Sequence, residues 1–183
     1  MMYVFLAPGF EETEAITPID LLRRCELDVQ IVGVGSAIIK GSHNIPVFAD
    51  IEENEIVLDE NLQMIVLPGG MPGTLNLEAS KKVQEAVEFC INNSVPIGAI
   101  CAAPTILGHK GYLNGKNAVC FQGYESQLLG ANVLFDSVCE DGNIITARGA
   151  GVSVQFGLKL VEKLISKERS EILGASLLCE KNK

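Results

Sequence analysis

The chain has 183 residues and a formal net charge of −9, with 48% hydrophobic and 20% charged residues. This is an ordinary globular composition, and the length fits one domain, which we expect to span residues 1–183. The negative charge argues against nucleic acid and anionic membranes as partners, because both bind basic surfaces. No export signal is visible and the most apolar stretch, 97–108, is too short to span a bilayer, so we expect a cytoplasmic location.

The first half of the chain alternates apolar runs with one helical pattern. In chain order, the predicted elements are a strand at 2–7, a helix at 12–25, a strand at 29–35, a hairpin at 37–50 with its turn at 41–44, an acidic loop or short helix at 52–61, and a strand at 64–70. Pro18 lies inside the predicted helix and suggests a kink. The first two predicted strands, at 2–7 and 29–35, are therefore joined by a helix.

The second half continues the alternation. In chain order, the predicted elements are a helix at 80–92 capped by Ser80, a strand at 96–100, a helix beginning near 102, strands at 117–121 and 143–147, a helix at 152–166, and a polar tail. Strands separated by helices imply an α/β fold whose mainly parallel sheet has helices on both faces. Ligands bind such sheets at the carboxyl ends of the strands, which here carry the segments 7–14, 68–73, 101 and 147–151.

Several common ligand sites are excluded or disfavoured by these strand ends. The first turn, APGFEE, places two carboxylates where a dinucleotide pyrophosphate would sit, and the glycine-rich GGMPGT at 69–74 lacks the lysine of a phosphate loop. The six cysteines are scattered without a C-x-x-C pair, so we expect free thiols and no metal site. No cofactor is expected.

Cys101 lies in the segment AICAA (99–103), where a strand is expected to turn into a helix. Small residues on both sides of a nucleophile are typical of a nucleophile elbow, because the sharp turn leaves no room for bulky side chains. The start of the helix would lower the pKa of the thiol, and the N–H groups of Ala102 and of the Gly69–Gly70 loop would form an oxyanion hole. The alternative is an inert cysteine in the core.

A thiol needs a proton partner, and the sequence offers few. His43 falls in the predicted hairpin turn, where we expect it to be exposed, and His109 lies two helical turns beyond Cys101, too far for a pair. The remaining candidates are the glutamates of the first helix, at 11, 12 and 14. Carboxylates favour the first turn of a helix for electrostatic reasons alone, but one of the three would face the strand ends, where burial would raise its pKa.

Four segments in this order resemble the ThiJ/PfpI superfamily, and within it the branch of the human parkinsonism-associated deglycase and the bacterial ThiJ-type chaperone. The segments are GFEETEA at 9–15, VLPGG at 66–70, AICAAP at 99–104 and TARGAG at 146–151. The resemblance implies a flavodoxin-like α/β sandwich and a homodimer. It implies that Cys101 is reactive, that Glu14 is the protonated carboxyl beside it, and that Gly70 and Ala102 are the nearby backbone donors. Arg148 would line the site or hold its loop through backbone hydrogen bonds.

Two departures from the family pattern bear on function. Ala102 replaces the histidine that follows the cysteine in the protease-like branch, so peptidase activity is not expected. Phe121 stands where the human-type branch has a histidine, which removes one general acid or base and leaves Glu14 to carry proton transfer.

Two functions follow from these residues. The first is a cysteine-dependent glyoxalase or deglycase that acts on 2-oxoaldehydes or glycation adducts; a hydrolase of small esters or amides is a variant of the same site. The second is a redox sensor or chaperone in which Cys101 is oxidised to the sulfinate and Glu14 stabilises that form. No sequence feature marks chaperone activity or a role in thiamine metabolism.

Overall fold

The computed structural model describes residues 1–179, and its centre is a seven-stranded sheet. The strand order is β10-β11-β7-β6-β1-β2-β5, and every neighbouring pair is parallel except β10 with β11. The strands are β1 (Met2–Leu6), β2 (Val29–Gly33), β5 (Ile51–Glu52), β6 (Met64–Leu67), β7 (Ile97–Ile100), β10 (Val138–Asp141) and β11 (Ile144–Ala147). Chain order reverses between β1 and β6, which is where α/β sheets commonly bind ligands.

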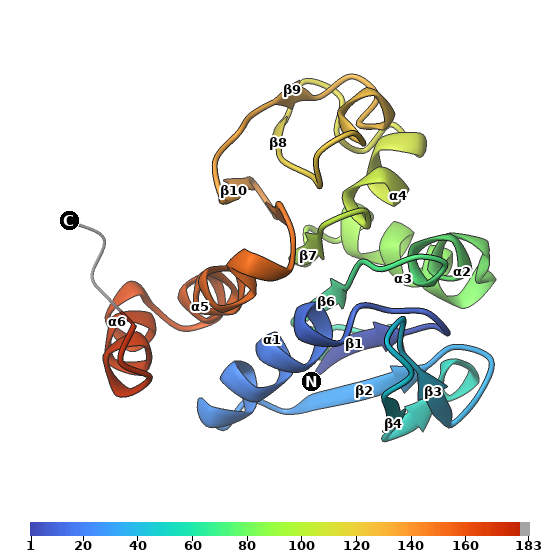
Figure 1. Cartoon of the computed structure of the whole chain (residues 1–183), viewed down its shortest axis with the longest axis horizontal. Coiled ribbons are helices and arrows are strands. Elements are labelled where there is room, and N and C mark those ends of the chain that lie inside the picture. The colour runs from blue at the N-terminus through green and yellow to red at the C-terminus, as the bar shows by residue number, and fades with distance from the viewer. Residues whose placement is uncertain (180–183) are drawn as a thin grey trace.

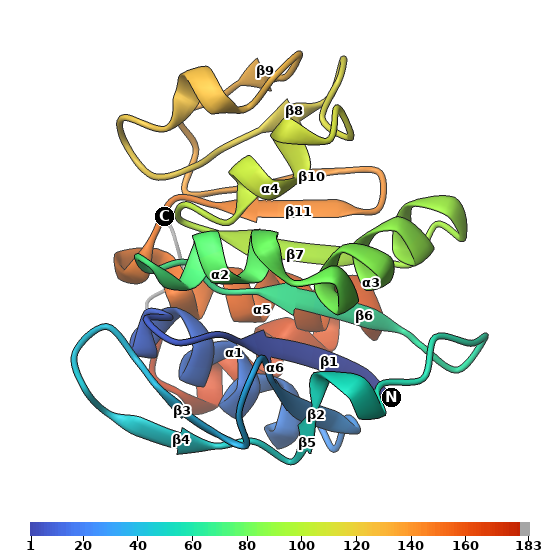
Figure 2. The same cartoon turned by 90° about the vertical axis from the view of Figure 1, so that its right-hand side faces the viewer.

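Helices cover both faces of this sheet (Figures 1 and 2). One face packs against α1 (Glu12–Arg24) and α5 (Ser153–Leu164), and α6 (Lys167–Ser176) packs against α5. The other packs against α2 (Gly73–Ala79), α3 (Lys81–Asn92) and α4 (Pro104–His109). Alternate side chains of β1 enter the two cores, since Val4 lies with the first group of helices and Phe5 with the second. Burial on both faces explains why the strands are continuous apolar runs, and each such side chain contributes about 1.5–3 kcal/mol.

Helices α1, α3 and α6 each begin with a side-chain cap. The Ser80 side chain accepts the N–H of Val83 at the start of α3, as predicted, and the Ser166 side chain accepts the N–H of Arg169 at the start of α6. The Glu11 side chain accepts the N–H of Glu14 and so begins α1. Such a cap is worth about 1 kcal/mol, and at α1 it also fixes the direction of the first turn.

Short elements complete the chain. A hairpin of β3 (Ile38–Lys40) and β4 (Pro46–Phe48) matches the predicted one at 37–50, and β8 (Asn117–Ala118) pairs with β9 (Asn132–Val133) outside the main sheet. The 3₁₀ turns are η1 (Glu53–Glu55), η2 (Glu125–Gln127) and η3 (Ala150–Val152). No helix in the described part of the chain is both long and apolar enough to cross a bilayer.

Three sequence predictions need correction. The strand predicted at 117–121 ends at Ala118 and does not join the main sheet, because it pairs with β9 instead. The prediction of a polar tail is wrong for residues 167–176, which form α6 because Leu173 packs beneath α5 and Ser166 provides a cap. Residues 180–183 of the predicted tail lie outside the described part of the chain. Helix α2 was not predicted. Strands β5 and β10 were also not predicted, since they pair at the two sides of the sheet and are short or polar.

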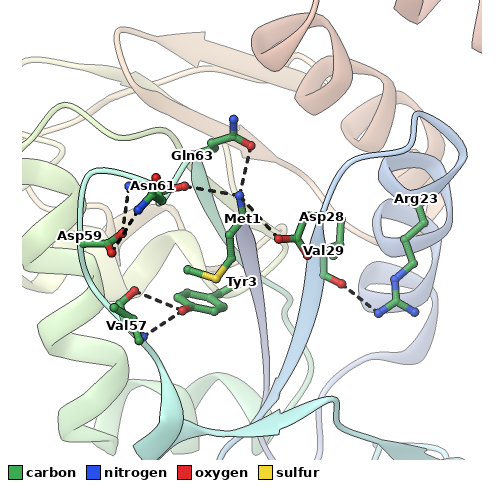
Figure 3. A network of polar contacts seen from close by, with 9 residues as sticks. All are labelled: Met1, Tyr3, Arg23, Asp28, Val29, Val57, Asp59, Asn61 and Gln63. Carbon is green, nitrogen blue, oxygen red and sulfur yellow. Dashed lines mark hydrogen bonds and ion pairs between the residues drawn. The ribbon is translucent and has the colours of Figure 1, made fainter.

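The amino-terminal edge of the sheet is tied by polar contacts (Figure 3). The Tyr3 hydroxyl donates to the Val57 carbonyl at 3.1 Å and accepts the Val57 N–H at 2.9 Å, and the Arg23 guanidinium donates to the Val29 carbonyl at 2.9 Å. This network lies at the beginning of β1 and β2. The groups discussed below lie at the opposite, carboxyl edge.

Candidate active site

Glu14 lies in the first turn of α1, directly after β1, and its side chain is buried with 1% of its surface exposed. Its Oε2 accepts the Gly69 N–H at 3.0 Å, and its carboxyl group also accepts the N–H of Ala150. The third contact is with the Cys101 side chain. Three strand ends, those of β6, β7 and β11, therefore meet at one carboxyl group.

Cys101 follows β7, and its backbone is left-handed with φ +65°. Its N–H donates to the Ala147 carbonyl at 2.9 Å, which continues the pairing of β7 with β11 by one residue. A left-handed conformation in a residue other than glycine costs about 1–3 kcal/mol and is common at functional sites. The sharp turn predicted from the small flanking residues is thus present, although α4 begins only at Pro104, three residues further on.

Gly69 lies between Glu14 and Cys101, and the two side chains can approach each other because Gly69 has no side chain of its own. A Cβ atom at this position would lie 2.6 Å from the Cys101 Cβ and 2.6 Å from the Glu14 Oε2. Gly70 has φ +90°, and a Cβ atom at this position would lie 2.4 Å from the Glu11 backbone nitrogen. Both glycines of the Pro-Gly-Gly segment are therefore required for β6 to approach α1 and Cys101 this closely.

Two backbone donors face the Cys101 sulfur. The N–H groups of Ala102 and Gly70 lie near enough to favour its thiolate form and so oppose the rise of its pKa. The sulfur is partly exposed, whereas Cys25, Cys90, Cys120 and Cys139 are buried. An oxygen bonded to a carbon at this sulfur would lie within reach of the same donors, as an oxyanion hole requires.

The raised pKa predicted for a buried glutamate is confirmed at Glu14, whereas the pKa of Cys101 differs from the sequence prediction. Burial raises the pKa of Glu14 to about 7, helped by the charge of Glu11 and opposed by its hydrogen bonds with Cys101, Gly69 and Ala150. Burial also raises the pKa of the Cys101 thiol to about 12, and the neighbouring Glu14 carboxylate adds to the rise. The predicted lowering of the thiol pKa is therefore wrong for this arrangement. A thiol that donates its proton to the Glu14 carboxylate is the form that these surroundings favour near neutral pH.

Arg148 and Phe121 border the pair on its outer side. The Phe121 N–H donates to the Cys101 carbonyl at 2.8 Å, and the Arg148 N–H donates to the Ser137 carbonyl at 3.1 Å. Gly149 connects these groups to the carboxyl, since a Cβ there would lie 3.2 Å from the Phe121 ring and 3.8 Å from the Glu14 Oε1. The predicted site residues thus all follow the carboxyl ends of strands in the main sheet. They are residues 14, 69, 70, 101, 102 and 148.

Comparisons with known proteins identify the family of the chain. The model of the DJ-1/PfpI family matches residues 1–163. The chain belongs to this family. It is 34% identical to protein dj-1beta of Drosophila melanogaster over 182 residues, 98% of this chain and 97% of that one. It is 29% identical to a Schizosaccharomyces pombe protein named glutathione-independent glyoxalase DJ-1, over 95% and 96% of the two chains. The solved structure of oxidised Toxoplasma gondii DJ-1 superimposes with a TM-score of 0.93 at 31% identity over 98% of each chain.

Neither histidine of this DJ-1/PfpI chain pairs with Cys101. The His109 ring lies 2.6 Å from the Glu78 carboxylate, and the His43 ring lies 2.8 Å from the Glu12 carboxylate with its side chain 70% exposed, as predicted for a hairpin turn. Glu11, Glu12 and His43 lie close enough to share a cation. The Glu12 oxygens, however, already accept the N–H groups of His43 and Ile45 and the Ser42 hydroxyl, so we assign this cluster to holding the hairpin against α1.

Sequence reasoning missed the contribution of Ala150, whose N–H donates to Glu14. The segment ARGAG was noted as a strand end, but a backbone donor leaves no mark in residue type. The role of Glu11 was also left open among three glutamates. Its side chain caps the Glu14 N–H at 2.7 Å, and that cap orients Glu14 toward the sheet edge.

Proposed function

We propose that this protein is a cofactor-independent glyoxalase that converts small 2-oxoaldehydes such as methylglyoxal into 2-hydroxy acids. The observation that carries the proposal is the contact between a buried carboxyl group and a partly exposed thiol whose sulfur faces two backbone N–H donors. The name of the Schizosaccharomyces pombe relative supports the substrate class. Early glycation adducts, which carry a related carbonyl-derived carbon, would react at the same sulfur.

The residues suit each step of this conversion. The Glu14 carboxylate takes the thiol proton of Cys101 as the sulfur adds to the aldehyde carbon, and the resulting alkoxide is held by the N–H groups of Gly70 and Ala102. Glu14 returns that proton to the alkoxide, giving a hemithioacetal. As a carboxylate again, it moves the C1 proton to C2, while the hydroxyl proton on the C1 oxygen passes to the C2 oxygen, and the product is a thioester of the 2-hydroxy acid. Water hydrolyses the thioester and restores the thiol.

A base with a pKa near 7 is suited to this work, because it is partly ionised at neutral pH and still accepts a proton readily. Since Cys101 stays a thiol until substrate arrives, its raised pKa does not oppose the reaction: the proton leaves as the carbon–sulfur bond forms. We expect kcat/KM to rise as the pH increases through about 7, because Glu14 must be ionised to act as the base.

The direct test measures lactate formed from methylglyoxal by the purified protein. We expect turnover in the wild type, none in Cys101→Ala, and wild-type turnover in Cys179→Ala, the matched control for another cysteine that is not fully buried. Absence of lactate from the wild type between pH 6 and 9 would contradict the proposal. Equal turnover in the two alanine variants would also do so.

A second candidate function is oxidation sensing at the same sulfur. It is favoured by the partial exposure of Cys101 and by the oxidised state named for the Toxoplasma gondii structure. A peroxide would oxidise the thiol to the sulfenic and then the sulfinic acid, each step releasing water, and protonated Glu14 would hydrogen-bond the sulfinate. Intact mass after mild peroxide treatment should rise by two oxygens, and the rise should vanish in Cys101→Ser. Oxidation at other cysteines instead would argue against it.

We also propose that the chain forms a homodimer. The hairpin of β3 and β4 exposes apolar side chains, including Ile45 at 55% and Phe48 at 71% of their surface, beside the start of α1. Exposed apolar patches of this kind on a soluble protein mark interaction surfaces. Sedimentation of the wild type and of Phe48→Ser should distinguish a dimer from a monomer.

A further inference from the structure

A pocket of about 410 Å³ opens beside Phe121 and Gly149, the residues that border Cys101 and Glu14. It is lined by Phe121, by Arg148 and by the backbone of residues 149–152. Two of these positions touch the pair itself: the Phe121 N–H bonds the Cys101 carbonyl, and Gly149 lies between the Phe121 ring and the Glu14 carboxyl. The volume is in the range of small-molecule sites. Cys101 and Glu14 are not among the lining residues, so a substrate held at the sulfur would reach this pocket by passing Phe121 and Gly149.

Arg148 brings a positive charge to this pocket that the described protein leaves uncompensated. Among residues 1–179 its guanidinium donates one hydrogen bond, from Nη1 to the Phe135 carbonyl at 3.4 Å, and it takes part in no ion pair. By contrast, Arg23 and Arg24 each bind a carboxylate, at 2.6 and 2.7 Å. A guanidinium has five N–H donors, and its fork geometry matches a carboxylate. The Arg148 side chain thus has donors to spare for an anionic ligand.

The remaining lining groups suit the rest of such a ligand. The Phe121 ring is 48% exposed and offers an apolar face in the same pocket as Arg148. The negative charge near the sulfur, from Glu11 and from Glu14 when it is ionised, would repel an anion placed there. An anionic group would therefore lie at Arg148, with its carbonyl end at Cys101 and an apolar arm along Phe121.

We propose that Arg148 and Phe121 form a carboxylate subsite, so that the preferred substrates are 2-oxoaldehydes carrying a carboxylate on a short apolar arm. This inference rests on the proposed glyoxalase function for its substrate class. It assigns Phe121, which replaces a histidine expected from the family pattern, to binding the arm of the substrate. Proton transfer stays with Glu14.

The kinetic test compares methylglyoxal with 4,5-dioxopentanoate, a 2-oxoaldehyde that carries a carboxylate. We expect wild-type kcat/KM to be at least tenfold higher for the anionic compound, and the ratio of the two values to fall at least tenfold in Arg148→Met, mainly through KM. Arg148→Lys should retain part of the preference because it keeps the charge without the fork. Arg24→Met, which removes an arginine from the far end of α1, should leave the ratio unchanged. A wild type without preference, or a ratio unaffected by Arg148→Met, overturns the subsite.

A binding test separates this subsite from the catalytic proposal. In the Cys101→Ser protein, calorimetric titration with benzoate and with its neutral isostere benzamide should show at least tenfold tighter binding of benzoate. Arg148→Met should abolish that difference, and Phe121→Ala should weaken both ligands. If the wild type turns over neither 2-oxoaldehyde, the glyoxalase proposal is contradicted while this titration still decides the subsite. Equal binding of benzoate and benzamide overturns the subsite even where lactate is formed.

Discussion

Glu12 and Glu14 are two residues apart in the first turn of α1 and both are buried, yet their surroundings favour opposite charge states. Burial raises the pKa of Glu12, but hydrogen bonds from His43 and from the backbone of the hairpin outweigh it, so its pKa is lowered overall. At Glu14 burial prevails over fewer donors, and its pKa rises to about 7. Burial alone therefore does not determine which glutamate is reactive; the number and charge of the donors do.

The two glutamates also share a structural device, because each packs against a glycine. A Cβ at position 41 would lie 2.3 Å from the Glu12 Oε1, and one at position 69 would lie 2.6 Å from the Glu14 Oε2. Gly41 belongs to the hairpin turn and leaves Glu12 enclosed by polar groups. Gly69 instead opens Glu14 toward a sulfur. The same close approach thus yields a structural anchor in one region and a reactive pair in the other.

The largest expected effect is on turnover. Glu14→Gln should lower kcat/KM for methylglyoxal by about 10²- to 10⁴-fold, because an amide cannot take the thiol proton. Glu12→Gln, the matched change on the same helical turn, should lower it less than tenfold, since Glu12 contacts the hairpin and not the sulfur. Steady-state lactate formation at pH 7.5 measures both. Similar losses in the two variants would show that the charge states described above do not separate the two roles.

The next effect is on the pH dependence of stability. The folded-state pKa of Glu14 is raised, so its contribution is fully present below pH 4.5 and is lost as the pH rises through about 7. A shift from 4.5 to about 7 corresponds to a change on the order of 3 kcal/mol in the free energy of unfolding. Glu14→Gln should therefore gain about that much stability relative to the wild type between pH 4 and pH 8.

Glu12 is the control for Glu14, because its effect on the free energy of unfolding should change with pH in the opposite direction. Its folded-state pKa is lowered, so its contribution is present above pH 4.5 and is lost as the pH falls below that value. Glu12→Gln should accordingly lose stability relative to the wild type as the pH rises through the acid range. Urea unfolding at each pH from 3 to 8 measures both variants. Parallel curves for the two would contradict opposite shifts.

Much of the main sheet was predictable from the sequence, because β1, β6 and β7 are buried on both faces and leave continuous apolar runs. The position of Cys101 at a tight turn was predictable from the small residues around it. The family resemblance singled out Glu14, but the residue pattern alone did not separate its role from that of Glu12, since three glutamates in one helical turn look alike until the Glu11 cap and the hairpin contacts orient them. The raised pKa of the thiol was missed because the sequence shows the small neighbours of Cys101 but not the depth of its burial.

The smallest effect concerns backbone strain, which both regions contain. Cys101 and Asn44 both have a left-handed backbone, with φ of +65° and +64°. Asparagine adopts this conformation at a lower energetic cost than cysteine does. At position 101, Gly should give a free energy of unfolding about 1 kcal/mol higher than Ala, because glycine relieves the strain and neither substitute carries a sulfur. Asn44→Gly should differ from the wild type by less than that. Chemical denaturation of Cys101→Gly, Cys101→Ala and Asn44→Gly measures these differences. If Gly and Ala were equally stable at position 101, the left-handed turn at the sulfur would be unstrained and the active-site backbone would resemble the hairpin turn.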